Sequence, residues 1–468
     1  MQISSLEQIK KIYMIGIGGT SMSGLAMMSA VNGLEVAGSD MRANMYTDKL
    51  EKAGIKVYIG HDKNNVPADA DLVVYSAAIN INTNVEAIAA KEYNIQLMER
   101  SYFLGLLTRY YPKTIAVSGT HGKTTTTSLV SLMLLDAGED PSISLGGTIP
   151  KINANSLVGN SEYFVIEACE FIDSFLHTEH YIGIILNIEE DHLDYFTDGI
   201  DQIVESFTNF AKIIPKEGHL IANGDDPNVA KVLPHIDTTI HTFGLGESND
   251  WRAANIIYDS LGKPTFDVFH KGSLYASFSL KIPGEHNVMD ALSVIACGSI
   301  LGISIESLQK TFQEFDGAKR RFEFKGEERG IKVFEDYAHH PTELRVTIQA
   351  CLNYDHNKLW VVFQPHTYSR TFLLFDGFVD AVASAGEVIF NDIYSDREAN
   401  DWNIYSEDLA VKVVEKHAVP ASVISSFEDI VAYIIERAAP GDLVLVAGSQ
   451  SINQVASDLV DALKMHTA

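Results

Sequence analysis

The sequence predicts an α/β protein of three domains, and three observations support this prediction. The chain has 468 residues, about three times the length of an average domain, so each third can bury its own core. Short apolar runs alternate with helix-like patterns from end to end, which is typical of parallel sheets covered by helices. Two glycine-rich turns, at residues 16–24 and 119–126, each join a strand pattern to a helix pattern. We expect domains at residues 1–110, 111–317 and 318–468.

The composition narrows the class of protein. There are 62 acidic residues against 35 basic ones, a formal net charge of −27, which disfavours a nucleic-acid partner because binding phosphates requires basic groups. No run approaches the roughly 18 apolar residues of a membrane span, and residues 1–5 lack the pattern of an export signal, so we expect a cytoplasmic protein without membrane insertion. Cys169, Cys297 and Cys351 are too few and too far apart to predict a disulfide framework or a zinc cluster.

The first domain is predicted to hold a doubly wound parallel sheet. Its expected strands are residues 11–15, 35–38, 57–59 and 72–75, with a helix at 25–32. The first turn nearly matches the dinucleotide fingerprint G-x-G-x-x-G, with Gly16 and Gly18 in place but Ser21 at the third glycine position. Asp40 falls about where a ribose-binding acid would lie, and Ser76 follows a strand at the edge where ligands gather. On this motif alone, NAD, a UDP-sugar and no ligand all remain open.

The second turn, residues 119–126 with the sequence GTHGKTTT, predicts a phosphate site. It follows the apolar run 114–118 and precedes a helix pattern, so backbone N–H groups and the helix N-terminus can face an anionic oxygen. Lys123 can reach the outer phosphates of ATP, and the Thr124 hydroxyl can bind Mg²⁺. The generic G-x-x-x-x-G-K-[ST] pattern fails because Val117 occupies its first glycine position, but the shorter G-T-x-G-K-T-T pattern fits. The residues expected to bind ATP here are Gly119, Thr120, His121, Gly122, Lys123, Thr124 and Thr125.

Polar side chains follow the next predicted strands. These strands are residues 163–166, 182–186 and 220–222. Glu167 ends the first strand, and residues 187–194 (NIEEDHLD) follow the second. Because parallel strands end at one edge of a sheet, we expect Glu167 and His192 beside the phosphates held by Lys123. Glu167 and Thr124 offer the oxygen donors that Mg²⁺ prefers, whereas histidine is an unusual Mg²⁺ ligand, so a capping or core role for His192 stays open.

A third α/β unit is expected beyond residue 317. Its predicted strands are residues 332–334, 359–363, 388–390 and 443–446. Helical stretches separate these runs, as in the first domain.

Taken together, the motifs resemble those of the Mur ligase family, the ATP-dependent amide-forming enzymes of peptidoglycan precursor synthesis. The motifs are residues 119–126, Glu167, residues 187–194, His286 with Asn287, and residues 336–339 (DYAH). The alanine-adding branch of the family is the most similar, on the strength of residues 16–24, 339–343 (HHPTE) and 364–370 (QPHTYSR). The match spans all three predicted domains.

The resemblance implies a Mur ligase-like architecture: a Rossmann-like N-terminal domain for the UDP-sugar, a central P-loop-type ATPase domain, and a Rossmann-like C-terminal domain that closes on ATP and the amino acid. It implies ATP, Mg²⁺, UDP-N-acetylmuramate and L-alanine as ligands, and a monomer or homodimer. In the implied reaction, the lactyl carboxylate of the sugar nucleotide attacks the γ-phosphate of ATP, and the amine of alanine then attacks the acyl phosphate.

The resemblance also implies roles for individual residues. The UDP part would contact Gly18, Gly19, Thr20, Ser21, Ser39, Asp40 and Ser76. ATP would contact His286 and Asn287 near adenine, Arg320 or Arg321 at phosphate, and Asp336 at ribose. The metal residues would be Thr124, Glu167 and His192, with Lys123 as the phosphate lysine. The incoming amino acid and the reacting carboxyl would meet Tyr337, His339, His366 and Arg370, with His339 a candidate base.

Some residues depart from the family pattern, and some alternatives remain. Thr367 replaces a basic residue common in relatives, Cys169 replaces an acidic one, and residues 195–211 lack the lysine that several Mur ligases carbamylate. The missing lysine fits the alanine-adding branch. The alternatives are a recycling ligase that attaches a murein peptide to UDP-N-acetylmuramate, an NAD-dependent enzyme, and a non-catalytic nucleotide-binding module. The histidines expected only to pack or to lie at the surface are His61, His177, His180 and His270.

Overall fold

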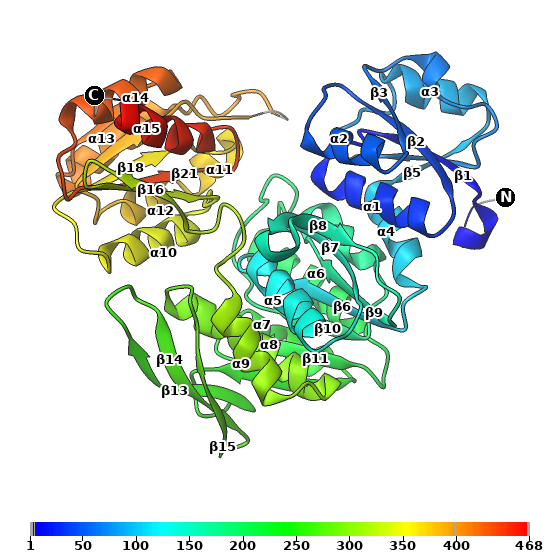
Figure 1. Cartoon of the computed structure of the whole chain (residues 1–468), viewed down its shortest axis with the longest axis horizontal. Coiled ribbons are helices and arrows are strands. Elements are labelled where there is room, and N and C mark those ends of the chain that lie inside the picture. Colours follow the sequence, from blue (N-terminus) through cyan, green and yellow to red (C-terminus); the bar gives the residue numbers. More distant parts are fainter. Residues whose placement is uncertain (1–2, 4, 396–397, 466–468) are drawn as a thin grey trace.

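The computed structural model describes residues 3, 5–395 and 398–465; the rest, including part of the N-terminal segment considered above, lies outside it. The described residues form three sheets with helices around them, arranged as three lobes in chain order (Figure 1). The predicted α/β class and three-domain architecture are confirmed. The boundaries near residues 110 and 317 stay predictions, and each sheet lies within one predicted range. Among the described helices, none is both long and apolar enough to cross a membrane.

The N-terminal lobe has a five-stranded parallel sheet in the order β3-β2-β1-β4-β5. Its strands are β1 (Lys11–Ile15), β2 (Glu35–Asp40), β3 (Lys56–Ile59), β4 (Leu72–Tyr75) and β5 (Gln96–Glu99). Its helices are η1 (Leu6–Gln8), α1 (Thr20–Val31), α2 (Met45–Lys52), η2 (Lys63–Asn65), α3 (Val85–Glu92) and α4 (Arg100–Thr108). The helix predicted at 25–32 begins earlier, at Thr20, because Gly19 caps it directly from the glycine turn. The sequence does not predict β5, since QLME holds no long apolar run.

The central lobe has a ten-stranded sheet in the order β15-β14-β13-β12-β11-β10-β6-β9-β7-β8. Its strands are β6 (Lys113–Ser118), β7 (Ser142–Ile149), β8 (Ala154–Leu157), β9 (Tyr163–Glu167), β10 (Ile182–Ile185), β11 (His219–Asn223), β12 (Thr239–Gly244), β13 (Trp251–Tyr258), β14 (Pro264–His270) and β15 (Ser273–Ser279). Its helices are α5 (Lys123–Asp136), η3 (Pro150–Ile152), η4 (Phe171–His177), α6 (Ile200–Lys212), α7 (Val229–Val232), η5 (Leu233–His235), α8 (Glu285–Leu301) and α9 (Ile305–Glu314). The sequence predicts only the apolar parallel strands β6, β9, β10 and β11. Strands β13 to β15 pair antiparallel and mix polar with apolar residues, so no apolar run marks them.

The C-terminal lobe has a six-stranded sheet in the order β16-β17-β21-β18-β19-β20, parallel except for β16 at one edge. Its strands are β16 (Glu323–Glu328), β17 (Ile331–Asp336), β18 (Leu359–Phe363), β19 (Glu387–Phe390), β20 (Ala421–Val423) and β21 (Leu443–Ala447). Its helices are α10 (Pro341–Leu352), α11 (Tyr368–Leu373), α12 (Phe375–Ala381), α13 (Ser406–His417), α14 (Phe427–Arg437) and α15 (Asn453–Met465). The four predicted strands correspond to β17, β18, β19 and β21.

The order of the central strands places the second glycine turn between two polar strand ends. Strand β6 pairs in parallel with β9 on one side and with β10 on the other. Val117 lies opposite Glu167, and Ser118 lies opposite Ile185. The turn after Ser118 is therefore flanked by Glu167 and by the segment that follows β10, as the sequence predicts.

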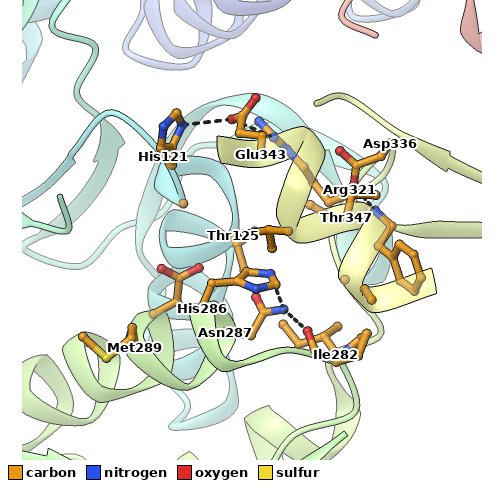
Figure 2. Close-up of a pocket in the computed structure, with 18 of the residues that line it drawn as sticks. His121, Thr125, Ile282, His286, Asn287, Met289, Arg321, Asp336, Glu343 and Thr347 are labelled. Carbon is orange, nitrogen blue, oxygen red and sulfur yellow. Dashed lines mark hydrogen bonds and ion pairs between the residues drawn. The ribbon is translucent and has the colours of Figure 1, made fainter. Parts of the chain in front are cut away.

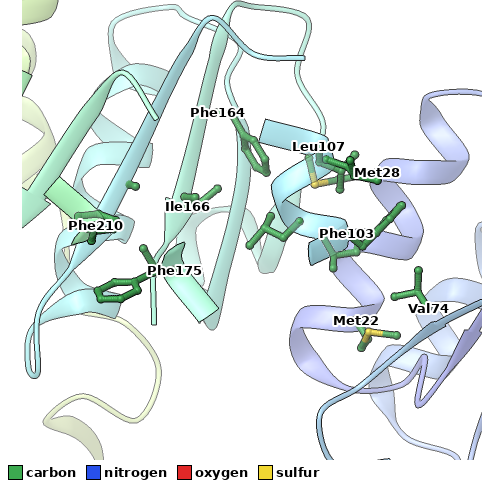
Figure 3. Packing of buried hydrophobic residues seen from close by; sticks show 14 of the residues in the cluster. Met22, Met28, Val74, Phe103, Leu107, Phe164, Ile166, Phe175 and Phe210 are labelled. Atoms are coloured by element: carbon green, nitrogen blue, oxygen red, sulfur yellow. The ribbon is translucent and has the colours of Figure 1, made fainter. Parts of the chain in front are cut away.

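An apolar cluster joins the N-terminal and central lobes. Phe103 and Leu107 of α4 belong to the same buried cluster as Phe164 of β9 and Phe175 of η4 (Figure 3). Gly105 lets α4 approach η4 closely, because a Cβ there would lie 2.1 Å from the His177 carbonyl oxygen. The two lobes thus share one core.

Candidate active site

The second turn joins β6 to α5 through two glycines in the left-handed half of conformational space. Gly119 has φ +144° and Gly122 has φ +81°. A Cβ on Gly122 would lie 2.6 Å from Asp290 Oδ1, so glycine is required against α8. Asn187 fixes the turn from outside: its Oδ1 accepts from the backbone N–H of His121 at 2.7 Å, and its Nδ2 donates to the His121 carbonyl at 3.1 Å.

Lys123 is the first residue of α5, and its side chain, 14% exposed, is largely enclosed by the turn. Its Nζ donates to the carbonyls of Gly119 at 2.5 Å and Thr120 at 3.0 Å. It also contacts both carboxylate oxygens of Glu170, at 3.1 and 2.9 Å. Burial favours the neutral amine, but the Glu170 carboxylate outweighs it and raises the pKa of Lys123 above its ordinary value. The ammonium therefore stays charged where an anion would enter the turn.

The expected metal residues lie beside the start of α5. The Thr124 hydroxyl donates to the Glu167 carboxylate at 3.1 Å. A second group, Glu170, Asp191 and His192, has its ligand atoms within 4.8 Å of one another. His192 Nδ1 is buried and has no hydrogen-bond partner among the described residues, and burial lowers the pKa of this ring. Carboxylate and hydroxyl oxygens fit a hard divalent cation such as Mg²⁺, and a neutral imidazole fits ligation.

A cavity of about 680 Å³ opens between the central and C-terminal lobes. Figure 2 shows its wall: Thr125, His286 and Asn287 come from the central lobe, and Arg321 and Asp336 come from the C-terminal side. The size suits a nucleotide. The predicted ATP residues that line it are His121, Gly122, Thr125, His286, Asn287 and Asp336.

The start of α8 provides one wall of this cavity. The Asn287 Nδ2 donates to the Pro283 carbonyl at 2.6 Å and lies 3.0 Å from His286 Nε2. Burial lowers the pKa of His286 to about 4, so the ring is neutral. Burial also raises the pKa of Asp290 to about 8, so this carboxyl is mostly protonated at neutral pH. The wall is polar but uncharged, which suits a base more than a phosphate.

Two neighbouring arginines have different roles. Arg320 binds within its own lobe, donating to Glu335 at 2.9 Å and to the carbonyls of Gly448 and Gln450, each at 2.9 Å. It does not line the cavity, whereas Arg321 does and lies 3.7 Å from Glu343. Of the two arginines that the sequence leaves open, Arg321 is the one that lines the cavity, and a phosphate contact stays a prediction. Both guanidinium groups lie near the Tyr337 ring, at 4.8 Å for Arg320 and 5.1 Å for Arg321, and Arg320 has a φ of +62°.

Asp336 ends β17 at the rim of the cavity. Its carboxylate accepts from the backbone N–H groups of Phe322 and Ala338, each at 2.7 Å. Burial nevertheless raises the pKa of Asp336 to about 6. The next residue, Tyr337, has its ring 5.1 Å from the Arg321 guanidinium. Two backbone hydrogen bonds therefore fix Asp336 at the rim of the cavity, and its contact with ribose stays a prediction.

The residues predicted to meet the amino acid and the reacting carboxyl form a connected group. Arg370 donates to Asp191 Oδ1 at 2.9 and 2.8 Å and to His366 Nδ1 at 3.1 Å. Burial raises the pKa of Asp191, but Arg370 outweighs it and holds that pKa well below its usual range. The His339 ring lies 6.0 Å from that of His366. His339 Nδ1 lies 3.1 Å from the Tyr337 carbonyl, which only accepts, so Nδ1 carries the proton; burial lowers the pKa of His339 to about 4.

The first glycine turn is separate from this group: among the described residues, none of those predicted to bind the UDP part lines the cavity. Gly18 donates its N–H to Asp40 Oδ2 at 2.9 Å, and a Cβ there would lie 2.7 Å from Thr47 Cγ2. Asp40 thus supports the turn directly. The Ser39 hydroxyl is buried and donates to Glu86 at 2.5 Å, which corrects the expectation that it faces a ligand.

The remaining residues of the first turn lie at the surface or between lobes. Gly19 is exposed at the N-cap of α1. The Thr20 carbonyl accepts from Asn155 of the central lobe, and the Ser21 hydroxyl accepts from Arg100 at 3.2 Å. Ser76 is partly exposed at the end of β4. Gly18, Gly19, Thr20, Ser21, Asp40 and Ser76 stay predictions as UDP contacts.

Three polar residues at the centre of the site were not predicted from the sequence. Glu170 pairs with Lys123, Asp191 pairs with Arg370, and Glu343 lies 3.3 Å from His121. The only sequence signal was their position within or beside the recognised motifs. Their partners come from other elements, so no spacing rule identifies the pairs.

The departures and the unassigned histidines have structural explanations. Thr367 is buried at φ +66° before α11, so it makes no exposed anion contact. Burial raises the pKa of Cys169 to about 11, which keeps the thiol neutral. The four histidines all make packing or hydrogen-bonded contacts: His177 stacks on Tyr102, His180 on Phe210 and His270 on Trp251, and His61 lies 2.8 Å from Glu86.

Comparison with known families agrees with this architecture. The family models named Mur ligase family, catalytic domain; Mur ligase middle domain; and Mur ligase, glutamate ligase domain match residues 11–112, 117–298 and 320–450. The chain belongs to the Mur ligase family, and the predicted resemblance is confirmed.

Individual members of the family show how similar this chain is to particular enzymes. The chain is 46% identical to the UDP-N-acetylmuramate–L-alanine ligase of Clostridium acetobutylicum over 95% of this chain and 96% of that protein. It is 43% identical to the enzyme of the same name from Caldanaerobacter subterraneus, covering 98% and 99%. Among solved structures, the UDP-N-acetylmuramate-alanine ligase of Thermotoga maritima aligns with a TM-score of 0.81 at 26% identity, covering 97% and 99%. A murein peptide ligase of Psychrobacter arcticus aligns with a TM-score of 0.72 at 25% identity, covering 97% and 98%.

Proposed function

We propose that this protein is an ATP-dependent ligase that joins L-alanine to the lactyl carboxylate of UDP-N-acetylmuramate in peptidoglycan precursor synthesis, with Mg²⁺ as its metal. The observation that carries the proposal is the identity of 43% or more to L-alanine ligases over nearly the whole chain. The geometry supports it, because the predicted ATP turn, metal donors and acceptor residues lie around one junction between lobes. A cytoplasmic location and a monomer or homodimer stay predictions.

The first step is phosphorylation of the carboxylate. A carboxylate is a poor acylating agent because its carbon is electron-rich, and transfer of the γ-phosphoryl group converts one oxygen into a leaving group. Lys123 supplies a fixed positive charge in the turn, and its Nζ must exchange Glu170 for phosphate oxygens when ATP binds. Bound at Thr124 and Glu167, Mg²⁺ would supply further positive charge to the phosphates.

The second step is attack by the amine of alanine on the acyl phosphate, which releases phosphate. The amine must first lose a proton. His339 is our candidate base because of its position: its Nδ1 faces two acceptors, the Tyr337 carbonyl and the Glu343 carboxylate, which leaves the Nε2 lone pair to accept a proton. Arg370, oriented by Asp191, is placed to bind an anionic group beside it. Closure of the C-terminal lobe would exclude water from the acyl phosphate.

The test is an acceptor panel with phosphate release as the readout. The purified protein, ATP, Mg²⁺ and UDP-N-acetylmuramate are incubated with L-alanine, L-serine, glycine, or the L-Ala-γ-D-Glu-meso-diaminopimelate tripeptide. We expect the largest kcat/KM with L-alanine. A preference for the tripeptide would instead support the recycling ligase, whose solved relative has a similar fold. No phosphate release with any acceptor would contradict a ligase.

A further inference from the structure

The segment after β10 contacts the ATP turn on one side and the C-terminal lobe on the other. Toward the turn, Asn187 brackets the backbone of His121, and the Glu189 N–H donates to the Thr120 hydroxyl at 2.9 Å. Toward the C-terminal lobe, Glu189 Oε2 accepts from the Thr342 hydroxyl at 2.7 Å. The same short segment therefore contacts both partners at once.

The His121 side chain lies between the central and C-terminal lobes and contacts a carboxylate of each. Its Nδ1 lies 3.3 Å from Glu343 Oε1 of α10, as drawn in Figure 2, and its Nε2 lies 3.5 Å from Glu189 Oε2 of the central lobe. Burial lowers the pKa of His121, but the two carboxylates outweigh it and raise the pKa to about 9. The ring is thus an imidazolium at neutral pH, held between one carboxylate from each lobe. The other charged or titratable neighbours are His340, with its ring at 4.6 Å, and Asp290 on α8.

Glu343 connects the junction to the rest of the site. Besides His121, its carboxylate accepts from the backbone N–H of His339 at 3.1 Å and lies 3.7 Å from Arg321. These partners have separate predicted tasks: His121 belongs to the ATP turn, Arg321 lines the nucleotide cavity, and His339 is the candidate base. A shift of Glu343 would move all three contacts together.

We propose that His121 and Glu343 form a latch that ties closure of the C-terminal lobe to the ATP turn and thereby positions Arg321 and His339. Both are positioning residues, and the latch rests on the proposed ligase function. Its contacts are polar and exposed to water when the lobe opens, so the latch can be made and broken in each catalytic cycle.

A metal site is the competing interpretation, since His121, Glu189 and His340 have ligand atoms within 4.8 Å of one another. The hydrogen bonds argue against it. His340 Nε2 lies 3.1 Å from the Glu190 carbonyl, and its Nδ1 accepts from the Thr342 N–H at 3.3 Å. Both ring nitrogens of His340 are therefore occupied, whereas a ligand needs one free lone pair.

The test is a double-mutant cycle with His121→Asn, Glu343→Gln and the double variant. Each change is nearly isosteric and removes one charge. We expect kcat for L-alanine ligation to fall about 10- to 100-fold in each single variant, because misplacement by about 1 Å costs this much, with less change in KM for UDP-N-acetylmuramate. The loss in the double variant should be smaller than the product of the two single losses, since the contact between His121 and Glu343 can be lost only once. Multiplicative losses would contradict the latch.

Closure is measured separately by small-angle X-ray scattering with a non-hydrolysable ATP analogue and Mg²⁺, without acceptor. The wild type should become more compact, and the variants should stay closer to the ligand-free form. His417→Asn is the matched control, because His417 pairs with Asp380 at 2.8 Å inside the C-terminal lobe. Equal compaction in wild type and variants would overturn the latch even if ligation is observed. If the wild type becomes more compact than the variants but no ligation is observed, the latch stands and only the proposed function is contradicted.

Discussion

The two outer lobes meet the central lobe through interfaces of opposite character. The N-terminal lobe shares one buried apolar cluster with it, including Phe103 and Phe164. The apolar clusters of the C-terminal lobe contain only residues of that lobe. Its contacts with the central lobe are polar, such as Arg370 with Asp191 and His121 with Glu343.

This difference indicates which lobe moves. Separating an apolar interface exposes its surface to water and costs free energy in proportion to the area. Polar groups can exchange a protein partner for water at a small net cost. We therefore expect the N-terminal and central lobes to form one unit, onto which the C-terminal lobe opens and closes as ATP and the amino acid enter.

The largest effect on activity is expected from substitution of a polar residue of the site, Lys123. Lys123→Ala removes the fixed charge that faces the phosphates and should lower kcat/KM on the order of 10³-fold. It also leaves the buried Glu170 carboxylate without its partner, so thermal stability should fall as well. Steady-state phosphate release measures the change in kcat/KM. The control is Lys151→Ala, which removes a lysine paired with Asp136 and Glu314 away from the turn. Near-normal turnover of Lys123→Ala would refute its phosphate role.

A substitution in the apolar cluster shared by the N-terminal and central lobes should lower stability instead of activity. Phe103→Ala leaves a cavity between the lobes and should lower the free energy of unfolding by about 3 kcal/mol, with kcat of the folded enzyme within about threefold of wild type. Urea unfolding measures the loss. Val31→Ala on α1 of the same lobe is the control, because Val31 is 62% exposed. Equal losses at both positions would show that the shared cluster is not what joins the lobes.

The pH dependence of stability sharpens the same comparison. His180 is buried against Phe210, and burial lowers its pKa to about 3. The unfolded chain takes up this proton as pH falls through about 6.5 and the folded chain does not, so stability is lost on acidification, by about 2 kcal/mol at pH 5. In His180→Phe this part of the loss should disappear, as measured by unfolding at pH 7 and pH 5. If the free energy of unfolding falls as much between pH 7 and pH 5 in His180→Phe as in the wild type, the lowered pKa of His180 is contradicted. His235→Phe, at an exposed position, is the control.

The smallest effect on activity is expected from removing one hydrogen bond between the central and C-terminal lobes. Thr342→Val removes the donor to Glu189 and should weaken closure by about 1 kcal/mol, or about fivefold in kcat. Thr265→Val breaks an exposed hydrogen bond to Ser279 in the antiparallel strands and should leave kcat unchanged. The hydrogen bond has no part in closure if the two variants have equal kcat.

The sequence predicts the apolar framework better than the polar pairs. Buried parallel strands such as β10 and β18 carry continuous apolar runs, and Glu167 follows such a run, so its place was predictable. Glu170 was not, because positive φ angles at Ile172 and Asp173 give η4 a kink that no periodicity reveals. The sequence likewise left Arg320 and Arg321 open, because the partners of Arg320, Glu335 and the carbonyls of Gly448 and Gln450, come from other elements.

The most direct test of the account follows oxygen through the reaction. UDP-N-acetylmuramate labelled with ¹⁸O in the lactyl carboxylate is incubated with the enzyme, ATP, Mg²⁺ and L-alanine, and the released phosphate is analysed by mass spectrometry. If the carboxylate attacks the γ-phosphate at the Lys123 turn, each phosphate carries one oxygen from the labelled carboxylate. Amide formation with unlabelled phosphate would contradict the acyl phosphate and the placement of ATP proposed here.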